Sequence, residues 1–492
     1  LLVKIKTDKR RIYYMSISKQ KQLFINMMGN IIVFITNIAI SFFLTPYIVK
    51  NIGVEANGFV TLANNFISYA SIITIAVNSM AARFITIKYI NGDYDEANSY
   101  YTSVLIGNLT IAVVLFIPAI MIVAYLEKLI NIPTDLIFDV KLLFSFIFLN
   151  FFITTSLPNW ATCFFLKNKI YLQSIGTILT SILRVALLVL AFAFFDARVF
   201  YVGMVASIVT LCNQLWSVHY KKKLVPDLKI KKQSFKMNYL VELISSGIWN
   251  SITQLGTLLL SGLDLLIANL FLGPMQMGVL SIVKIIPNTI SSLASALSGV
   301  FCPALTIEYA KGNFNEILKE LKMGMKITTA LLTILLSAVI VWGKEFFSLW
   351  QPTQDAYMLQ ILSILSCLSF MVSNSIQVLY NVFSVVNKLK PSALAVLIGG
   401  VLNTIITYIL LKTTNLGLFA IAATSSVLNI IRHIVYTIPY TAKYLNLKWT
   451  TFFPEVFLSL GIMASHIIIG FIIRQVAVVD SWLTLIIWGG VF

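Results

Sequence analysis

Charged residues are scarce in this sequence. They make up 11% of its 492 residues, whereas hydrophobic residues make up 58%, and the mean hydropathy is +0.89. Soluble domains carry roughly 25% charged residues. A soluble globular core of this length is therefore excluded, and the sequence predicts an all-α integral membrane protein.

Residues that usually carry catalysis or metal binding are equally few. The four cysteines lie in or at the ends of apolar runs, without CxxC spacing. His433 and His466 lie in apolar runs with no cysteine, glutamate or second histidine at ligand spacing. A GxxxxGK[ST] nucleotide loop is missing as well. These absences favour a protein that is not an enzyme and has no cofactor.

Long apolar runs are abundant. A run of about 20 residues can cross a hydrocarbon core of ~30 Å as a helix. Such runs predict 12 to 14 transmembrane helices, because the last run is short. They lie near residues 23–49, 58–82, 99–126, 138–165, 170–195, 198–219, 239–271, 276–300, 323–343, 357–384, 389–411, 416–438, 452–474 and from 481 onward.

The chain also repeats itself. Residues 23–96 align with residues 243–316 without a gap, at a constant offset of 220. The match is clearest where 86–96 faces 306–316, with five identical positions. The repeat predicts two pseudo-symmetric six-helix lobes around a central cavity, an arrangement that transporters use. Two glycine pairs superpose at the same offset, Gly53 on Gly273 and Gly58 on Gly278.

One string has the DxD pattern that can hold a divalent cation between two carboxylates. It is Asp93-Tyr94-Asp95, and its copy in the second half is Asn313-Phe314-Asn315. The copy lacks both carboxylates. The pattern therefore predicts the start of a helix.

Lysine and arginine are distributed unevenly between alternate loops. With the N-terminus inside, the cytoplasmic segments hold 26 of them and the outside loops hold 6. Short translocated loops tolerate few basic residues, so this asymmetry predicts a cytoplasmic N-terminus. The net charge of +17 then reflects contact with anionic membrane lipids, without any nucleic acid.

These features divide the chain into segments. The first apolar run is too long for a signal peptide and is expected to stay attached as helix 1. The predicted segments are a cytoplasmic N-terminal segment (1–22), an N-lobe of helices 1–6 (23–219), a basic cytoplasmic linker (220–238), a C-lobe of helices 7–12 (239–438) and additional helices 13–14 (439–492), the last of which is too short for a comfortable span and is expected to be incomplete.

Four charged residues lie inside predicted spans: Arg184, Asp264, Lys284 and Arg432. A charge in hydrocarbon costs about 2.5–3.5 kcal/mol on insertion scales, which makes each a candidate functional residue. Asp264 and Lys284 lie at similar depths, about 10–12 Å from their shared outer turn, and can form an ion pair. Two roles stay open for Asp264: it neutralises Lys284, or it carries a coupling proton or sodium ion.

The repeat places a neutral polar residue opposite each intramembrane cation. Such positions are expected to face an aqueous cleft, since a site facing lipid would be apolar. Three cations and one carboxylate leave the cleft positive, which indicates an anionic substrate. The pairs are Lys284 with Asn64 and, with a slip of one residue, Arg184 with Asn403 and Arg432 with Asn213. The predicted substrate-binding residues are Arg184, Lys284, Arg432, Asn64 and Asn403.

Pro287 lies one turn after Lys284. Proline removes a backbone hydrogen bond and clashes with the carbonyl four residues earlier, at position 283. A kink or partly unwound turn is therefore predicted here, and Pro287 is the candidate hinge.

The loop patterns resemble those of a known family. They are the Gly53-x4-Gly58 turn, the Tyr89-x-x-Gly92-Asp93-Tyr94 loop, their second copies and the basic mid-chain loop. Together they resemble the polysaccharide-exporter branch of the multidrug/oligosaccharidyl-lipid/polysaccharide superfamily, in particular Wzx-type O-antigen and capsule flippases. The resemblance covers nearly the full chain.

This resemblance implies a multi-pass protein of the bacterial cytoplasmic membrane that works by alternating access. The implied substrate is an undecaprenyl-diphosphate-linked oligosaccharide, carried from the cytoplasmic to the outer leaflet for surface polysaccharide biosynthesis. Polysaccharide polymerase and chain-length proteins are implied as partners.

Other functions stay open. A cation-coupled multidrug exporter of the same superfamily would share the architecture and use Asp264 as its coupling carboxylate, but a cation-rich interior disfavours organic cations. A peptidoglycan-precursor flippase is a further alternative. A membrane-embedded polysaccharide polymerase or ligase would need a large outside loop, and no outside loop here is longer than about 15 residues.

The charge asymmetry gives a test of topology. Single cysteines placed at 272–276 and 412–416 should react with a membrane-impermeant thiol reagent in intact cells, and cysteines at 221–236 should react only after the cells are opened. Labelling of the 221–236 segment in intact cells would overturn the predicted orientation.

Overall fold

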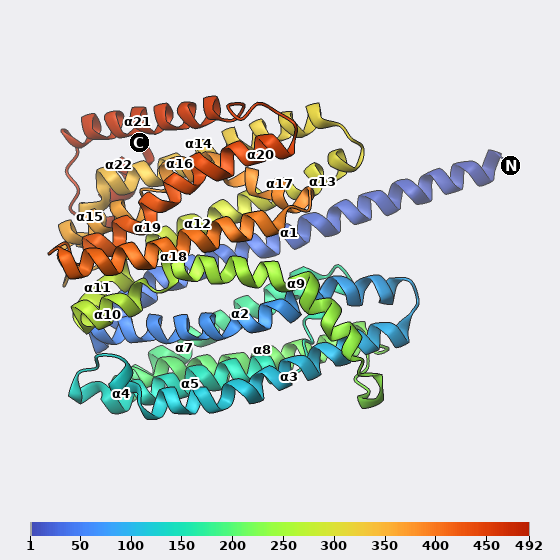
Figure 1. The fold of residues 1–492 in the computed structure, drawn as a ribbon, viewed down its shortest axis with the longest axis horizontal. Coiled ribbons are helices and arrows are strands. Elements are labelled where there is room, and N and C mark those ends of the chain that lie inside the picture. Colours follow the sequence, from blue (N-terminus) through green and yellow to red (C-terminus); the bar gives the residue numbers. More distant parts are fainter. Residues whose placement is uncertain (1, 492) are drawn as a thin grey trace. The chain divides into compact units, whose positions relative to one another are not determined.

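The computed structural model describes residues 2–491, which form helices joined by turns and contain no strand (Figure 1). Twelve helices in this stretch are long and apolar enough to cross a membrane. A bent pair, Ala356–Cys367 with Phe370–Val385, meets at 45° and raises the number to as many as 13. The predicted all-helical membrane protein with 12 to 14 spans is confirmed.

The chain forms two compact units. The first holds the residues up to Ile52, Ala70–Leu129 and Thr134–Ile248, and the second holds Gly53–Tyr69, Ile130–Pro133 and the residues from Trp249 onward. Two long helices, α2 (Val54–Ile90) and α9 (Met237–Thr257), therefore contribute to both units. The lobe and linker boundaries inferred from the sequence stay predictions.

The remaining helices of the first unit are α1 (Leu2–Ile52), α3 (Tyr94–Ala124), α4 (Leu126–Leu129), η1 (Thr134–Leu136), α5 (Ile137–Ser156), α6 (Thr162–Leu166), α7 (Ile170–Phe194), α8 (Phe200–Leu224) and η2 (Lys232–Ser234). Those of the second unit are η3 (Leu258–Gly262), α10 (Asp264–Leu272), α11 (Pro274–Val283), α12 (Ile285–Gly299), α13 (Cys302–Ala310), α14 (Phe314–Trp350), α15 (Ala356–Cys367), α16 (Phe370–Ile376), η4 (Gln377–Leu379), α17 (Tyr380–Val385), α18 (Leu389–Thr413), α19 (Leu418–Arg432), η5 (His433–Thr437), α20 (Ile438–Tyr444), α21 (Phe453–Arg474) and α22 (Trp482–Val491).

In the first unit, α5 packs against α8, and α7 packs against both α1 and α8. Asn26 fastens α1 to the start of α7. Its side-chain amide donates to the Asn168 carbonyl at 3.0 Å, and its oxygen accepts from the Tyr171 N–H at 3.1 Å. A buried polar side chain is stable here because backbone groups satisfy it.

The basic segment 220–238 is held against α3. The Asn98 side-chain oxygen accepts from the Lys229 N–H at 2.7 Å. Val225 and Leu228 are buried in the apolar cluster of the first unit. This segment is therefore anchored by a backbone hydrogen bond and by apolar burial.

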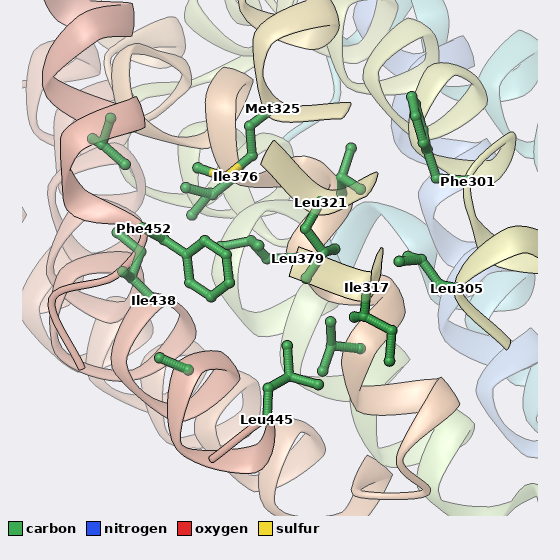
Figure 2. Close-up of a cluster of buried hydrophobic side chains, with 14 of the residues drawn as sticks. Phe301, Leu305, Ile317, Leu321, Met325, Ile376, Leu379, Ile438, Leu445 and Phe452 are labelled. Atoms are coloured by element: carbon green, nitrogen blue, oxygen red, sulfur yellow. The ribbon is translucent and has the colours of Figure 1, made fainter. Parts of the chain in front are cut away.

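In the second unit, a large apolar cluster joins α13, α14, α16, η4, α20 and the start of α21 (Figure 2). Leu321 of α14 and Phe452 before α21 are fully buried within it. Moving a side chain of this size out of water into a packed core contributes roughly 1.5–3 kcal/mol. Inside a membrane, where the surrounding lipid is also apolar, close packing supplies the stabilisation instead.

The helices α14 and α21 are joined by two ion pairs. Lys322 pairs with Glu455 at 2.8 Å near the start of both helices, and Glu345 pairs with Arg474 at 2.5 Å near the end of both. The helices therefore run parallel. α14 supplies the cation of the first pair and the carboxylate of the second. This alternation of charge favours the observed register of the two helices over a shifted one.

The internal repeat is visible in the backbone. Equivalent turns of the two halves contain residues with positive φ, a conformation that glycine and asparagine adopt most readily. A third pair, at an offset of 219, extends the repeat past the gap-free alignment. The pairs are Gly53 (90°) with Gly273 (94°), Gly92 (85°) with Gly312 (71°) and Asn168 (52°) with Asn387 (55°).

The DxD string begins a helix in both copies, as predicted. α3 starts at Tyr94 and α14 at Phe314. In the second copy the Asn313 side chain accepts a hydrogen bond from the Glu316 N–H at 3.5 Å, which is the role of a helix cap.

Two repeat-related glycines meet inside the second unit. A Cβ at Gly58 of α2 would lie 2.9 Å from the Cα of Gly278 in α11, and a Cβ at Gly278 would lie 2.5 Å from the Val54 carbonyl oxygen. The Asn57 side chain donates to the Ser281 hydroxyl at 2.9 Å beside this contact. Small residues let helix backbones approach this closely.

Gly278→Ala should therefore destabilise the protein. The added methyl forces the α2 and α11 backbones apart, at a cost of about 1–3 kcal/mol. Thermal unfolding of the detergent-solubilised protein measures this as a lower Tm. Gly461→Ala in α21 is the matched control, because its Cβ would meet nothing within 4 Å, and it should be neutral or stabilising by up to about 1 kcal/mol. Equal Tm values for both variants would contradict the close contact.

Candidate functional site

A cavity of about 640 Å³ lies within the second unit. Its wall comes from α2, α9, η3, α10, α12, α15, α16, η4, α17, α18, α19 and η5, and from Lys284 between α11 and α12. Twelve of the lining residues carry serine or threonine hydroxyls: Thr61, Thr253, Thr257, Ser261, Ser291, Ser295, Ser366, Ser369, Ser373, Ser392, Ser425 and Ser426. So many hydroxyls at membrane depth provide hydrogen-bond donors and acceptors for a polar ligand.

Asp264 and Lys284 form the ion pair expected from their depth. The Lys284 Nζ donates to Asp264 Oδ2. Asp264 is 2% exposed and begins α10, whereas Lys284 lines the cavity. A buried carboxylate and an ammonium neutralise each other here, which removes most of the cost of placing either charge inside the membrane.

Lys284 also marks a break in its helix. α11 ends at Val283 and α12 begins at Ile285, so Lys284 lies between the two helices. Pro287 lies in the first turn of α12 and lines the cavity. The interruption is therefore where the proline was expected to cause one, and the hinge role of Pro287 stays a prediction.

A π-helical turn, η3, precedes Asp264. Such a turn frees carbonyl groups that an α-helix would pair. The Asn403 amide donates to two of them, at 3.2 and 3.0 Å. Asn65 and Tyr69 both donate to the Gly262 carbonyl, at 3.3 and 2.9 Å. Side chains from α2 and α18 thus stabilise the irregular backbone beside the ion pair.

Arg432 lies at the start of the second π-helical turn, η5. One of its terminal nitrogens donates to the Tyr380 hydroxyl and to Asn429 Oδ1, each at 3.0 Å. The Tyr380 hydroxyl is also 3.0 Å from Nδ1 of His433. No acid among the described residues pairs with Arg432. Its guanidinium is held by neutral groups, so no carboxylate among these residues offsets its charge.

The cavity is therefore positive. Among the described residues that line it, Lys284 and Arg432 carry the charge, and none is acidic. Lys284 is neutralised by Asp264 behind the wall, so Arg432 supplies the unbalanced charge.

The other predicted site residues lie elsewhere. Asn403 is 1% exposed and does not line the cavity, because the η3 carbonyls use its amide. Asn64 is exposed and donates to the Val60 carbonyl of its own helix at 2.8 Å, and its neighbour Asn65 lines the cavity instead. Arg184 belongs to α7 in the first unit, is partly buried, and its Nε has no partner among the described residues.

Sequence reasoning missed Tyr380, Asn429 and the hydroxyl wall. Asn429 lies three residues before Arg432, a spacing that places both on one helix face. Ser291 with Ser295 shows the same periodicity inside an apolar run. The spacing of polar residues within the spans was therefore a usable signal, whereas Tyr380 is distant in sequence and gave none.

Comparison with known proteins gives one family match and several fold matches. A model of the family described as "Polysaccharide biosynthesis protein" matches residues 21–307. The uncharacterized membrane protein EpsK of Bacillus subtilis (strain 168) is 27% identical over 469 residues, which are 94% of this chain and 92% of EpsK.

Solved transporters share the fold. An inward-facing MATE family multidrug transporter of the MOP superfamily has a TM-score of 0.61 at 14% identity, over 83% of this chain and 94% of its own. Its outward-facing conformation gives 0.60 at 15%, over 86% and 94%. A Pyrococcus furiosus MOP transporter, for which reverse polarity of the binding pocket suggests a different function, gives 0.59 at 14%, over 87% and 96%. The expected transporter fold is confirmed.

The two roles of Asp264 can be separated by a double mutant. If it only neutralises Lys284, then Asp264→Asn or Lys284→Gln alone leaves an unpaired buried charge and should cost about 3–5 kcal/mol, and the double variant should recover most of the lost stability. Protein abundance in the membrane and Tm measure this.

If Asp264 carries a coupling ion, Asp264→Asn should abolish transport at normal abundance, and the double variant should not restore it. Wild-type transport and stability in all three variants would contradict both roles.

Proposed function

Because this chain belongs to the polysaccharide biosynthesis protein family, we propose that it is a flippase that moves undecaprenyl-diphosphate-linked oligosaccharide across the bacterial cytoplasmic membrane by alternating access. Surface polysaccharide such as O-antigen or capsule is the product it serves. The N-terminus lies in the cytoplasm in this proposal, and polysaccharide polymerase and chain-length proteins are its partners.

The observation that carries the proposal is the guanidinium of Arg432, held only by neutral partners among the described residues, in a cavity without acidic lining residues among those the structure describes. The diphosphate is the charged part of the substrate, and a charge resists transfer into a membrane most strongly. A planar guanidinium with several donors binds phosphate oxygens well, because it can offer two parallel hydrogen bonds.

The hydroxyl wall supports the oligosaccharide part of the proposal. Sugars present many hydroxyl groups, each of which needs a partner once water is removed. The serine and threonine side chains around Arg432 supply partners that act both as donors and as acceptors. The polyprenyl tail needs no polar partner and can remain in the lipid.

The remaining predicted residues enter as proposals. Lys284 is a second substrate-binding cation, which Asp264 neutralises in the ion pair. Arg184 is a further phosphate-binding residue in the first unit. Asp264 is the candidate carrier of a proton or sodium ion. Asn64 and Asn403 have supporting roles at the helices that form the site, Asn403 through the η3 carbonyls.

A cation-coupled drug exporter of the same fold is disfavoured by the same observation. An organic cation would meet the unbalanced charge of Arg432 without a lining carboxylate to offset it, and like charges at this depth repel strongly. An anionic substrate is attracted by the same charge.

Arg432→Ala should lower export at least about tenfold, because a charge-assisted hydrogen bond is worth about 1.5–3 kcal/mol. Surface polysaccharide, measured at equal membrane abundance of the protein, is the readout. Arg432→Lys should retain part of the export. Arg184→Ala and Lys284→Ala should also reduce it.

Lys319→Ala is the matched control, because the side chain of that lysine is 76% exposed and pairs with Glu316 one turn away. It should export normally. Normal export by all three variants Arg432→Ala, Arg184→Ala and Lys284→Ala would show that the anionic substrate is wrong, and their disappearance from the membrane would show a structural role instead.

A further inference from the structure

The Tyr380 hydroxyl lies between Arg432 and His433. Its oxygen is 3.0 Å from the terminal nitrogen Nη2 of Arg432 and 3.0 Å from Nδ1 of His433. All three residues line the cavity. Arg432 ends α19 and His433 begins η5, whereas Tyr380 begins α17. One hydroxyl group therefore connects two distant segments of the chain at the cavity wall.

The hydrogens of these contacts follow from the chemistry of the three side chains. A guanidinium can only donate hydrogen bonds, so the Tyr380 oxygen accepts from Arg432. The Tyr380 O–H then has one acceptor among the described residues, which is Nδ1 of His433. For Nδ1 to accept, the histidine must be neutral and carry its hydrogen on Nε2.

The opposite assignment leaves a donor without an acceptor. A hydrogen on Nδ1 of His433 would point at the Tyr380 oxygen, which already accepts from Arg432. The Tyr380 O–H would then have no acceptor among the described residues, and an unpaired donor in a buried wall is costly. The Thr437 hydroxyl is the other group near Nδ1, at the longer distance of 3.5 Å.

This polarity determines how the arginine is held. Nη2 of Arg432 donates to Tyr380 and to Asn429, so both of its hydrogens have an acceptor. The other terminal nitrogen, Nη1, has no hydrogen-bond partner among the described residues. While the Tyr380 O–H donates to His433, its lone pairs face Nη2. Without that acceptor the hydroxyl can rotate, and its hydrogen would then repel those of Nη2.

We infer that His433 is a positioning residue for the proposed anion site. It orients the Tyr380 hydroxyl, which holds the Arg432 guanidinium so that Nη1 is left for a phosphate of the substrate. This inference rests on the proposed flippase function and deepens it. An arginine side chain that is already ordered loses less entropy when the anion binds. His433 thus raises the affinity for the diphosphate without contacting it.

Packing is the competing interpretation, because His433 is 3% exposed. A histidine that only fills space would affect the protein independently of the Tyr380 hydroxyl. A histidine that acts through the hydroxyl should have no effect once the hydroxyl is removed. A double-mutant cycle therefore distinguishes the two interpretations.

The probe is undecaprenyl diphosphate, and the measurement is its Kd for the purified protein in detergent. Tyr380→Phe keeps the ring that lies 5.8 Å from the guanidinium carbon and removes only the hydroxyl. It should weaken binding about two- to tenfold, because the anion must then order the arginine. His433→Leu should weaken binding by the same factor, and the double variant should bind no more weakly than either. Losses that multiply in the double variant would overturn the inference.

Two further substitutions separate the nitrogens of His433. Asparagine places an amide oxygen near the position of Nδ1, so His433→Asn should bind almost as tightly as wild type. Glutamine places its amide near the position of Nε2, so His433→Gln should bind as weakly as His433→Leu. Rescue by glutamine but not by asparagine would overturn the positioning role. His219→Leu is the matched control, since His219 is exposed in α8 of the first unit, and it should bind as wild type.

The position of the hydrogen can be measured without any ligand. In protein that contains ¹⁵N-labelled histidine, the NMR signals of His433 are those that disappear in His433→Asn. They should show a hydrogen on Nε2 and none on Nδ1, and a hydrogen on Nδ1 would overturn the inference. Undiminished binding by Tyr380→Phe and His433→Leu would overturn this inference alone. Failure of the wild-type protein to bind the probe would overturn the proposed function as well.

Discussion

A polar group inside a membrane must find its partner within the protein. Hydrocarbon offers no hydrogen bonds, so every charge, freed carbonyl or hydroxyl in a span has to be satisfied by another part of the chain. In the second unit these demands are met around one cavity. The π turn η3 needs Asn65, Tyr69 and Asn403, and the Asp264 carboxylate needs Lys284.

The same requirement gives the cavity its chemistry. Lys284 loses its net charge to Asp264, but Arg432 is held by the neutral oxygens of Tyr380 and Asn429. A guanidinium held in this way is fixed in orientation and remains cationic, because arginine stays protonated in proteins. The hydrogen bonds of Arg432 thus offset part of the cost of placing this charge in the cavity wall.

Regular packing elsewhere leaves these irregular turns in a fixed frame. α14 and α21 are joined at both ends by ion pairs and near their starts by the apolar cluster of Figure 2. Gly58 and Gly278 bring two repeat-related helices into backbone contact. A firm frame around a few irregular turns is what a transporter needs, because the turns can then rearrange without the helices melting.

The sequence by itself determined the class of protein, the helices and the repeat. Hydropathy and periodicity depend on residues close in the chain, so α10, α11 and the break near Pro287 could be predicted, and the depth of Asp264 and Lys284 in adjacent spans was enough to pair them. Only the tertiary structure decided that Tyr380 holds Arg432 across 52 residues, that Asn403 serves η3 rather than the cavity, and that Asn65 replaces Asn64 in its wall. Rotation of a helix by one residue turns a side chain by 100°, and that rotation is set by packing against distant helices, which no local pattern records.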